Sequence, residues 1–525
     1  MKNCAKMVQK RLGATLTRRQ LLQFCLVVGM LVGMLAHGFM FANKIPNHDD
    51  MKHYVDLTGV GAESGRFVLY IFWKLFSTMS VPWLNGILGL LFLSGASFLL
   101  CDAFDCRHAW QAGAVAVVAV VFPVNVSIYC YMYQAHAFML GIACAMAAPW
   151  MIRRGGRLGL IWAALCVMLA TGVYQVFLML AIGLLIVFVI WYATRDEGRT
   201  PGAAWSMAIR CALVALGGLA LYFAGVWVVV HIGGITLNEY QGINHMGQVS
   251  WNDLPAKLQT AYRTALEWYF TDTPSYTTKL MRLAQGGAIV LGWVWLVATV
   301  IRALLARRWG HAALLVACAL LLPASAAGIY FMGDEIVVHH ITLIPMIVLL
   351  LQPVLCMNPQ PLPDGTRRTG MAKRACALLL ATAYLVYGFS LAVIDNQAYY
   401  RMYMAYTRAE HFMSRVAARI ESMPGYQPGL RLVTVGYLNE KESLIYFEYD
   451  IADRFLPFVG ILNEVDYAWP HVSVRMLTQV AGLPLEPVED WQPTEEEAAI
   501  VQAMPCYPAE GSIVITDDLC IVRFS

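Results

Sequence analysis

Two adjacent aspartates, Asp49 and Asp50, stand in the part of this chain that is richest in reactive side chains, residues 43–54. Pro46 ends the apolar run before them, and the residues from Asp49 onward can begin a short helix. A carboxylate in a first helical turn stays ionised at neutral pH, because backbone N–H groups and the helix dipole favour its charge. It can then accept the proton of an attacking hydroxyl group. A helix cap that merely faces water explains the pair equally well.

Arg66 offers a phosphate-binding side chain in the next polar segment, because the fork of its guanidinium fits phosphate oxygens. Lys52 adds a cation close to the two aspartates. An arginine that reaches lipid headgroups is at least as good an interpretation of Arg66. The aromatic, apolar stretch at 68–76 predicts a helix that lies in the membrane interface.

Uncharged polar side chains gather at one end of the apolar segments. Each one alone is more simply explained as a polar residue at a helix end whose hydrogen bonds are made locally. Because the whole set falls on the same side, it predicts a wet cavity open to that side of the bilayer. The set is Asn125, Gln134, His136, Tyr174, Gln175, His231, His339 and His340.

A turn with two carboxylates, Asp334 and Glu335, precedes His339 and His340. Carboxylates and imidazoles together suit a divalent metal, but this spacing does not identify a metal site. Binding of a sugar hydroxyl or solvation of the turn are the other interpretations. A divalent metal is compatible with these residues but not indicated by them, so we expect no cofactor.

The elements that must hold these side chains are membrane spans. Of the 525 residues, 59% are hydrophobic and 14% are charged, against about 25% charged in soluble domains. The apolar runs are long enough to cross a hydrocarbon layer of about 30 Å. No long basic run accompanies the net charge of +3, so nucleic-acid binding is not expected. About eleven spans are predicted, near 20–42, 83–101, 110–127, 132–152, 158–174, 177–193, 207–231, 286–305, 311–330, 336–354 and 376–395.

Lys and Arg predict the orientation, since short positive loops stay in the cytoplasm. With the N-terminus inside, every short inner loop holds arginine, whereas the short outer turns hold no Lys or Arg. The first apolar run is too long for a cleaved signal peptide, so we expect a retained span. The predicted parts are a cytoplasmic segment at 1–19, a transmembrane domain at 20–395 with outer loops at 43–82 and 232–285, and an extracytoplasmic domain at 396–525.

The last part of the chain predicts a small α/β domain. It combines a helical pattern at 399–422, a strand at 430–437 and a terminal hairpin at 512–516 and 519–524. Thr494 and Glu497 predict a capping box at the start of a short helix. The fold class is therefore mainly α, a polytopic helical bundle with a C-terminal α/β domain.

Cys506 and Cys520 flank the predicted hairpin. In an oxidising compartment a disulfide between them is the favoured interpretation. Two unpaired cysteines are the alternative.

The order of these motifs resembles that of the type-II O-antigen glucosyltransferase family, which belongs with the GT-C membrane glycosyltransferases. The span count, the orientation and the outer C-terminal domain extend the likeness over most of the chain. Its motifs are Asp49-Asp50, Ser64-Gly65-Arg66-Phe67, Tyr133-Gln134-Ala135-His136 and Gly172-Val173-Tyr174-Gln175.

The resemblance implies an inverting enzyme of the bacterial inner membrane. Its donor would be glucose, or a similar hexose, on a polyprenyl phosphate, and its acceptor a lipopolysaccharide O-antigen or another surface glycan outside that membrane. Either Asp49 or Asp50 would be the general base. Its partners would include an enzyme that makes the donor and a flippase that delivers it. The expected donor- and substrate-binding residues are Lys52, Arg66, Gln134, His136, Tyr174, Gln175, Asp334, Glu335, His339 and His340.

One feature departs from this class. GT-C enzymes often bind the donor phosphate through an arginine in a late outer loop, and the turn at 331–340 has none. Arg66, Lys52, Lys279 or Arg282 would bind it instead, or the donor is contacted differently.

Two other functions compete with a transferase. A flippase or transporter of a lipid-linked sugar is the alternative function, and the lack of charged residues near the middle of the predicted spans argues against ion-coupled transport. A binding module that uses its spans only as an anchor would not need so many of them.

Overall fold

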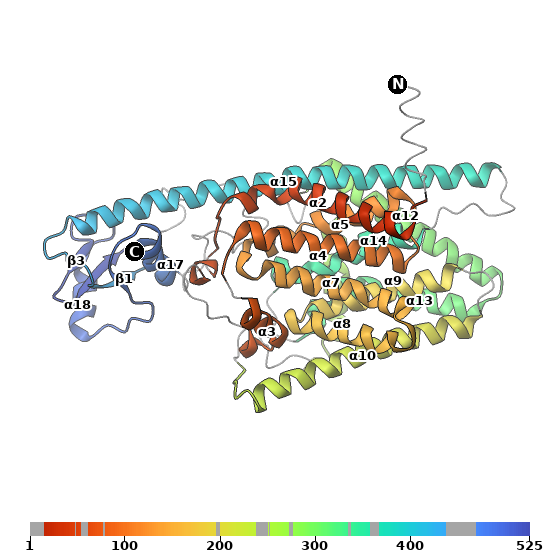
Figure 1. The fold of residues 1–525 in the computed structure, drawn as a ribbon, viewed down its shortest axis with the longest axis horizontal. Helices are drawn as coiled ribbons and strands as arrows, with labels where there is room; N and C mark the ends of the chain where they lie inside the picture. The colour runs from red at the N-terminus through yellow and green to blue at the C-terminus, as the bar shows by residue number, and fades with distance from the viewer. Residues whose placement is uncertain are drawn as a thin grey trace, which may run out of the picture. The chain divides into compact units, whose positions relative to one another are not determined.

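The chain forms two compact units in the computed structural model (Figure 1). The membrane unit consists of Met1–Ala42 and Leu57–Asn396, and the C-terminal unit consists of Asn43–Asp56 and Gln397–Ser525. The segment after the first span therefore belongs to the same unit as the end of the chain. The structure describes residues 15–47, 49–53, 61–76, 79–195, 200–237, 250, 252–271, 277–333, 338–357, 367–436 and 469–525.

Long apolar helices build the membrane unit, because a backbone in lipid must satisfy its own hydrogen bonds. Within the described residues, nine helices are long and apolar enough to span a membrane. Large apolar side chains such as Leu35 and Phe389 stay exposed on them, as lipid-facing residues do. These helices are α2 (Arg18–Ala42), α4 (Pro82–Ala103), α7 (Met132–Arg154), α8 (Gly159–Val173, preceded by the turn η3), α9 (Phe177–Arg195), α10 (Pro201–His231), α12 (Lys279–Leu305), α13 (Trp309–Ala326) and α15 (Arg367–Glu421).

Two predicted spans have an irregular form. The run at 110–127 folds as α5 (Ala109–Val121) and α6 (Val124–Cys130), which meet at an angle of 44°. Pro123 lies at this break and cannot continue a helix from the turn before it. The run at 336–354 begins as the 3-10 helix η6 (His340–Met346) and continues as α14 (Ile347–Cys356).

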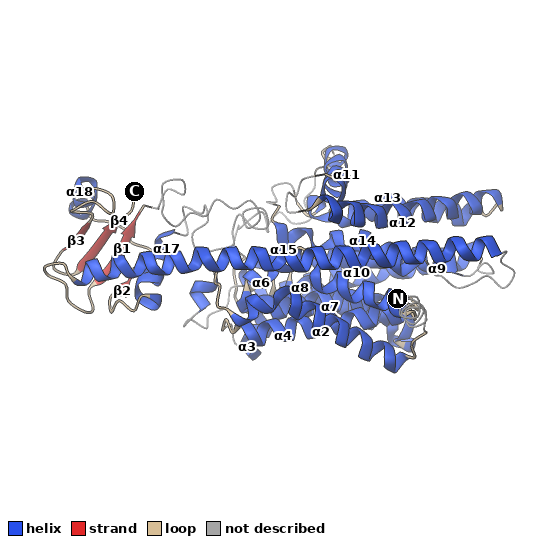
Figure 2. Cartoon of the chain, turned by 90° about the horizontal axis from the view of Figure 1, so that it is seen from above, coloured by secondary structure: helices blue, strands red, loops and turns tan. Residues whose placement is uncertain are grey.

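The helix α15 joins two elements that the sequence predicts as separate, the span at 376–395 and the helix at 399–422. Near its middle, Asn396 Nδ2 donates hydrogen bonds to the carbonyl oxygens of Leu35 (2.8 Å) and Ala36 (3.2 Å) in α2. Figure 2 shows α15 as one uninterrupted helix. The composition changes at residue 396, but nothing there breaks a helix.

An ion-pair network ties several helix ends together, and we call it the Asp102–Asp105 network. Asp102 has no exposed surface and accepts hydrogen bonds from Arg107 Nη2 (2.7 Å) and Trp150 Nε1 (2.9 Å). Asp105 forms ion pairs with Arg153 and, at 3.2 Å, with Arg195. The network joins the ends of α4, α7 and α9 to the start of α5.

A four-stranded sheet organises the C-terminal unit, with the order β2-β1-β4-β3 (Figure 2). The central strands β1 (Arg431–Val435) and β4 (Leu519–Arg523) are parallel, and β3 (Ile513–Ile515) forms the predicted antiparallel hairpin with β4. The short strand β2 (Glu486–Pro487) extends the sheet beside β1. Thr494 and Glu497 form the predicted capping box of α18 (Glu495–Ala503).

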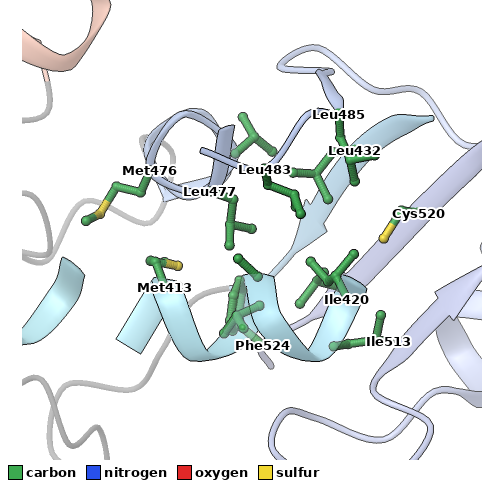
Figure 3. Packing of buried hydrophobic residues seen from close by; sticks show 14 of the residues in the cluster. Met413, Ile420, Leu432, Met476, Leu477, Leu483, Leu485, Ile513, Cys520 and Phe524 are labelled. Atoms are coloured by element: carbon green, nitrogen blue, oxygen red, sulfur yellow. The ribbon is translucent and has the colours of Figure 1, made fainter. Parts of the chain in front are cut away.

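The core of the C-terminal unit lies between the last turns of α15 and one face of the sheet (Figure 3). Met413 and Ile420 come from α15, Leu432 from β1, and Leu477 from the short π-helix η7 (Met476–Val480) that follows α17 (Trp469–Arg475). We call this cluster the C-terminal core.

The expected disulfide is not formed, because Cys506 and Cys520 are separate free thiols. Cys520 lies on β4 and points into the C-terminal core, where burial raises the pKa of its thiol to about 12 (Figure 3). Cys506 is exposed in the turn after α18. The sequence positions of the two cysteines, one on either side of the hairpin, do not determine whether their side chains face each other.

Candidate functional site

The segment that contains Asp49 and Asp50 forms a capped turn. The side-chain oxygen Oδ1 of Asn47 accepts a hydrogen bond from the backbone N–H of Asp50 at 2.7 Å. The carbonyl oxygen of Asn47 accepts a second one from Met51 at 3.2 Å. The predicted short helix is the 3-10 helix η1 (Asp50–His53), and Asn47 rather than an aspartate supplies the cap.

The two aspartates differ in exposure. Asp50 is 1% exposed, whereas Asp49 is partly exposed. Lys44 lies near Asp50: burial lowers the pKa of Lys44, and the negative charge of Asp50 opposes this shift. The pair therefore combines one solvent-accessible carboxyl group with one held beside a cation.

Arg66 is positioned by a glycine turn at the start of α3 (Phe67–Phe76). Gly65 ends the 3-10 turn η2 (Ala62–Ser64) with φ of 69°, a left-handed conformation that L side chains rarely adopt. A Cβ atom on Gly65 would lie 2.9 Å from Tyr222 Oη and 3.4 Å from Gln175 Nε2. The turn therefore needs glycine for both its backbone conformation and its space.

Phe67 holds the start of α3 against two neighbouring helices. A Cβ atom on Gly225 in α10 would lie 2.3 Å from the Phe67 ring, and one on Gly172 in α8 would lie 3.2 Å from it. Gln175 Nε2 also donates a hydrogen bond of 2.6 Å to the carbonyl oxygen of Ser64. These contacts fix the backbone on both sides of Arg66.

The guanidinium of Arg66 lies over the ring of Tyr174, 4.6 Å from the ring centroid. Tyr174 in turn stacks on Phe138, with ring centroids 5.1 Å apart. Arg66 is also close enough to interact electrostatically with His339 and Tyr222. We call Arg66, Tyr174, Gln175, Tyr222 and His339 the Arg66 cluster.

Among the residues that the structure describes, none neutralises the positive charge of Arg66. Its Nε is buried without a hydrogen-bond partner, and no carboxylate in the described part of the chain pairs with it. A cation–π contact supports a guanidinium from one face and leaves its N–H edge for an anion. The cluster can therefore bind a phosphate group.

Other residues that were predicted for the site have neighbours outside the Arg66 cluster. His136 is buried on α7 with its ring 5.0 Å from that of Phe72 in α3, and Gln134 is buried in the first turn of α7. His340 pairs with Ser127 Oγ at 2.6 Å.

Some predicted residues cannot be placed in the site. Asp334 and Glu335 lie outside the described residues, as does the side chain of Lys52. Asp49 and Asp50 belong to the C-terminal unit, whereas the Arg66 cluster belongs to the membrane unit. Lys279 and Arg282, the other candidates for the phosphate, lie in the first turn of α12.

The contacts that Tyr222 and Met51 make were not predicted from the sequence. Tyr222 lies inside a continuous apolar run, where one tyrosine carries no signal of its own. Met51 is an apolar residue in a polar loop, which was a signal that this loop packs against something.

The sequence model of one protein family, described as Glucosyl transferase GtrII, matches residues 38–359, more than half of the chain. The chain belongs to this family. No curated protein and no solved structure matches the chain. The match confirms the resemblance predicted from the motifs. The matched part of this GtrII family chain includes Asp49, Asp50 and the Arg66 cluster, and it ends before the C-terminal sheet.

Proposed function

We propose that this glucosyl transferase moves glucose, or a similar hexose, from a polyprenyl phosphate to a glycan at the cell surface. The acceptor is a lipopolysaccharide O-antigen or a related glycan, and the reaction takes place on the extracytoplasmic face of a bacterial inner membrane. Family membership and membrane-spanning helices support transfer of a sugar within a bilayer. The Arg66 cluster supports a donor that carries a phosphate.

The observation that carries this proposal is the unneutralised charge of Arg66. A sugar–phosphate bond breaks more readily when a cation stabilises the charge that develops on the leaving phosphate. Tyr174, the glycine turn and Phe67 hold Arg66 in place. A lipid-linked sugar phosphate brings such a group to the surface of the bilayer.

The proposed reaction is a single displacement. The acceptor hydroxyl oxygen forms a bond to the anomeric carbon while the bond from that carbon to the phosphate oxygen breaks. The electron pair stays on the polyprenyl phosphate, where Arg66 stabilises it, and the proton of the hydroxyl passes to Asp49 or Asp50. Attack opposite to the leaving phosphate inverts the anomeric configuration.

We propose the partners from the same chemistry. The donor must be made by an enzyme that joins an activated sugar to polyprenyl phosphate, and a flippase must deliver it to the outer leaflet. His136, His339 and Gln175 are proposed to contact the donor beside Arg66, and no cofactor is proposed.

A transfer assay with full-length protein in nanodiscs tests the proposal. Wild-type protein should move radiolabelled glucose from polyprenyl phosphoglucose to a glycan acceptor. Arg66→Gln should lower kcat/KM by about 10²-fold or more, since it removes one cation that acts on the transition state. Arg263→Gln is the matched control, because Arg263 is an exposed arginine that pairs with Glu267 on the same helix, and it should leave the rate unchanged.

Two results would contradict the proposal. One is equal transfer by Arg66→Gln and Arg263→Gln. The other is movement of intact labelled donor across a vesicle membrane by protein that forms no labelled glycan, which would support the flippase instead.

A further inference from the structure

The loop that carries Asp49 and Asp50 is built into the C-terminal unit. Met51, the residue directly after Asp50, has no exposed surface and belongs to the C-terminal core. The other members of this core come from α15, from in and around β1, β3 and β4, and from the segments around α17 and η7 (Figure 3). A residue near the start of the chain thus completes the core of a domain formed by its end.

Two hydrogen bonds to Asn47 tie the backbone of Met51 to that of Asp50. Asn47 bonds the N–H of Asp50 through its side chain and the N–H of Met51 through its carbonyl oxygen. Asn47 itself is fully buried. Because Asp49, Asp50 and Met51 are consecutive in one capped turn, the backbone of the aspartates cannot move far while Met51 stays in the core.

We call the loop at residues 43–53, which carries Asp49 and Asp50, the acidic loop. We infer that Met51 is a positioning residue for the transfer reaction and that the C-terminal unit sets the geometry of the acidic loop. The inference rests on the proposed function, in which Asp49 or Asp50 accepts the proton. An irregular loop after a membrane span is otherwise free to sample many conformations. Small displacements of a reacting group lower rates strongly, about 10²-fold for an error of about 1 Å.

This inference gives the C-terminal unit a role in the reaction itself. The family match ends at residue 359, so the match does not cover this unit beyond the acidic loop. A unit that only bound a partner would have no reason to take a core residue from the loop with the aspartates.

The experiment compares two methionines of the same core in the full-length protein in nanodiscs. Met51→Ala and Met413→Ala each remove a fully buried methionine, but only Met51 is attached to the acidic loop. Turnover is measured with polyprenyl phosphoglucose at a temperature where both variants are folded by circular dichroism. Met51→Ala should lower kcat about tenfold or more, with the KM for the donor changed less than about twofold.

Two further arms make the result specific. Met51→Leu restores a side chain of similar volume and should bring kcat back to within about twofold of wild type. Hydrogen exchange of residues 43–53 should rise in Met51→Ala and stay unchanged in Met413→Ala.

Equal kcat in the two alanine variants would overturn the inference, because Met51 would then be an ordinary core residue. Unchanged exchange at residues 43–53 in Met51→Ala would overturn it as well. Failure of the proposed function has a different signature: Asp49→Asn and Asp50→Asn would both remain active, whatever Met51→Ala does.

Discussion

Arg66 is held by packing in a position to bind an anion, and among the described residues no carboxylate pairs with it. Tyr174 supports its guanidinium, Phe67 fixes the backbone after it, and Gly65 gives the turn before it. No described carboxylate competes for its N–H groups. A charge held by packing keeps its full attraction for a ligand, because binding does not first have to break an ion pair.

Gly65→Ala tests whether this turn matters for activity. The new methyl group would approach Tyr222 Oη and Gln175 Nε2, and a positive φ strains an alanine by about 1 kcal/mol. We expect kcat/KM for transfer to fall about tenfold, since Arg66 follows directly in the chain.

Gly156→Ala is the control for Gly65→Ala. Gly156 also has a positive φ, 62°, but nothing lies within 4 Å of its Cβ position. It carries the same backbone strain outside the Arg66 cluster, so its activity should match that of wild type. A comparable loss of activity in both variants would show that strain alone explains the effect.

At this scale the sequence could suggest residue types but not their neighbours. The chemistry of Arg66, Tyr174 and His339 is visible in the sequence, and the structure brings these three together from distant segments. The contacts of Tyr222 depend on tertiary packing, which no local pattern records, whereas Met51 stands out as an apolar residue in a polar loop but its partners do not. The Cys506–Cys520 bridge was wrong for the same reason.

Helices were the most predictable elements, because the length and hydropathy of an apolar run are local properties. The α2, α7 and α9 helices begin and end within a few residues of the predicted spans. The break between α5 and α6 and the 3-10 form of η6 were not predicted, although Pro123 and Pro345 mark both places. A proline shows where a helix is weakened but not how far the chain then bends.

The Asp102–Asp105 network makes a prediction about how the helix ends are held together. Asp102→Ala would leave Arg107 and Trp150 without their buried acceptor. Removing one partner of a buried charge pair costs about 3 kcal/mol. We therefore expect a clear fall in the thermal unfolding midpoint of the purified protein.

Glu267→Gln is the comparison for that measurement. Glu267 pairs with Arg263 one helical turn away on an exposed surface of α11 (Leu254–Phe270), where such a pair contributes about 0.5 kcal/mol or less. Its midpoint should stay close to that of wild type. A midpoint for Asp102→Ala equal to that of Glu267→Gln would refute a structural role for the network.

At the scale of the whole molecule, the chain passes between its two units more than once. It enters the C-terminal unit after Ala42, leaves it before Leu57 and enters it again after Asn396. The composition of the chain changes near the second crossing, because the apolar runs end there. It could not predict the first, since a short polar loop looks the same whether it faces water or joins a distant domain.

Under the proposed function, Arg66 stabilises the leaving phosphate, and Asp49 or Asp50 accepts the proton of the acceptor hydroxyl. Family membership establishes a glucosyl transferase. The central claim is that the transfer depends on a carboxylate of the acidic loop.

Single-turnover transfer by Asp49→Asn and Asp50→Asn tests this claim most directly. Each variant keeps the shape of the side chain and removes its ability to accept a proton. With enzyme in excess over polyprenyl phosphoglucose, at least one variant should transfer label to the glycan about 10²-fold more slowly than wild type, while donor binding is retained. Near-normal transfer by both variants in folded protein would contradict the account.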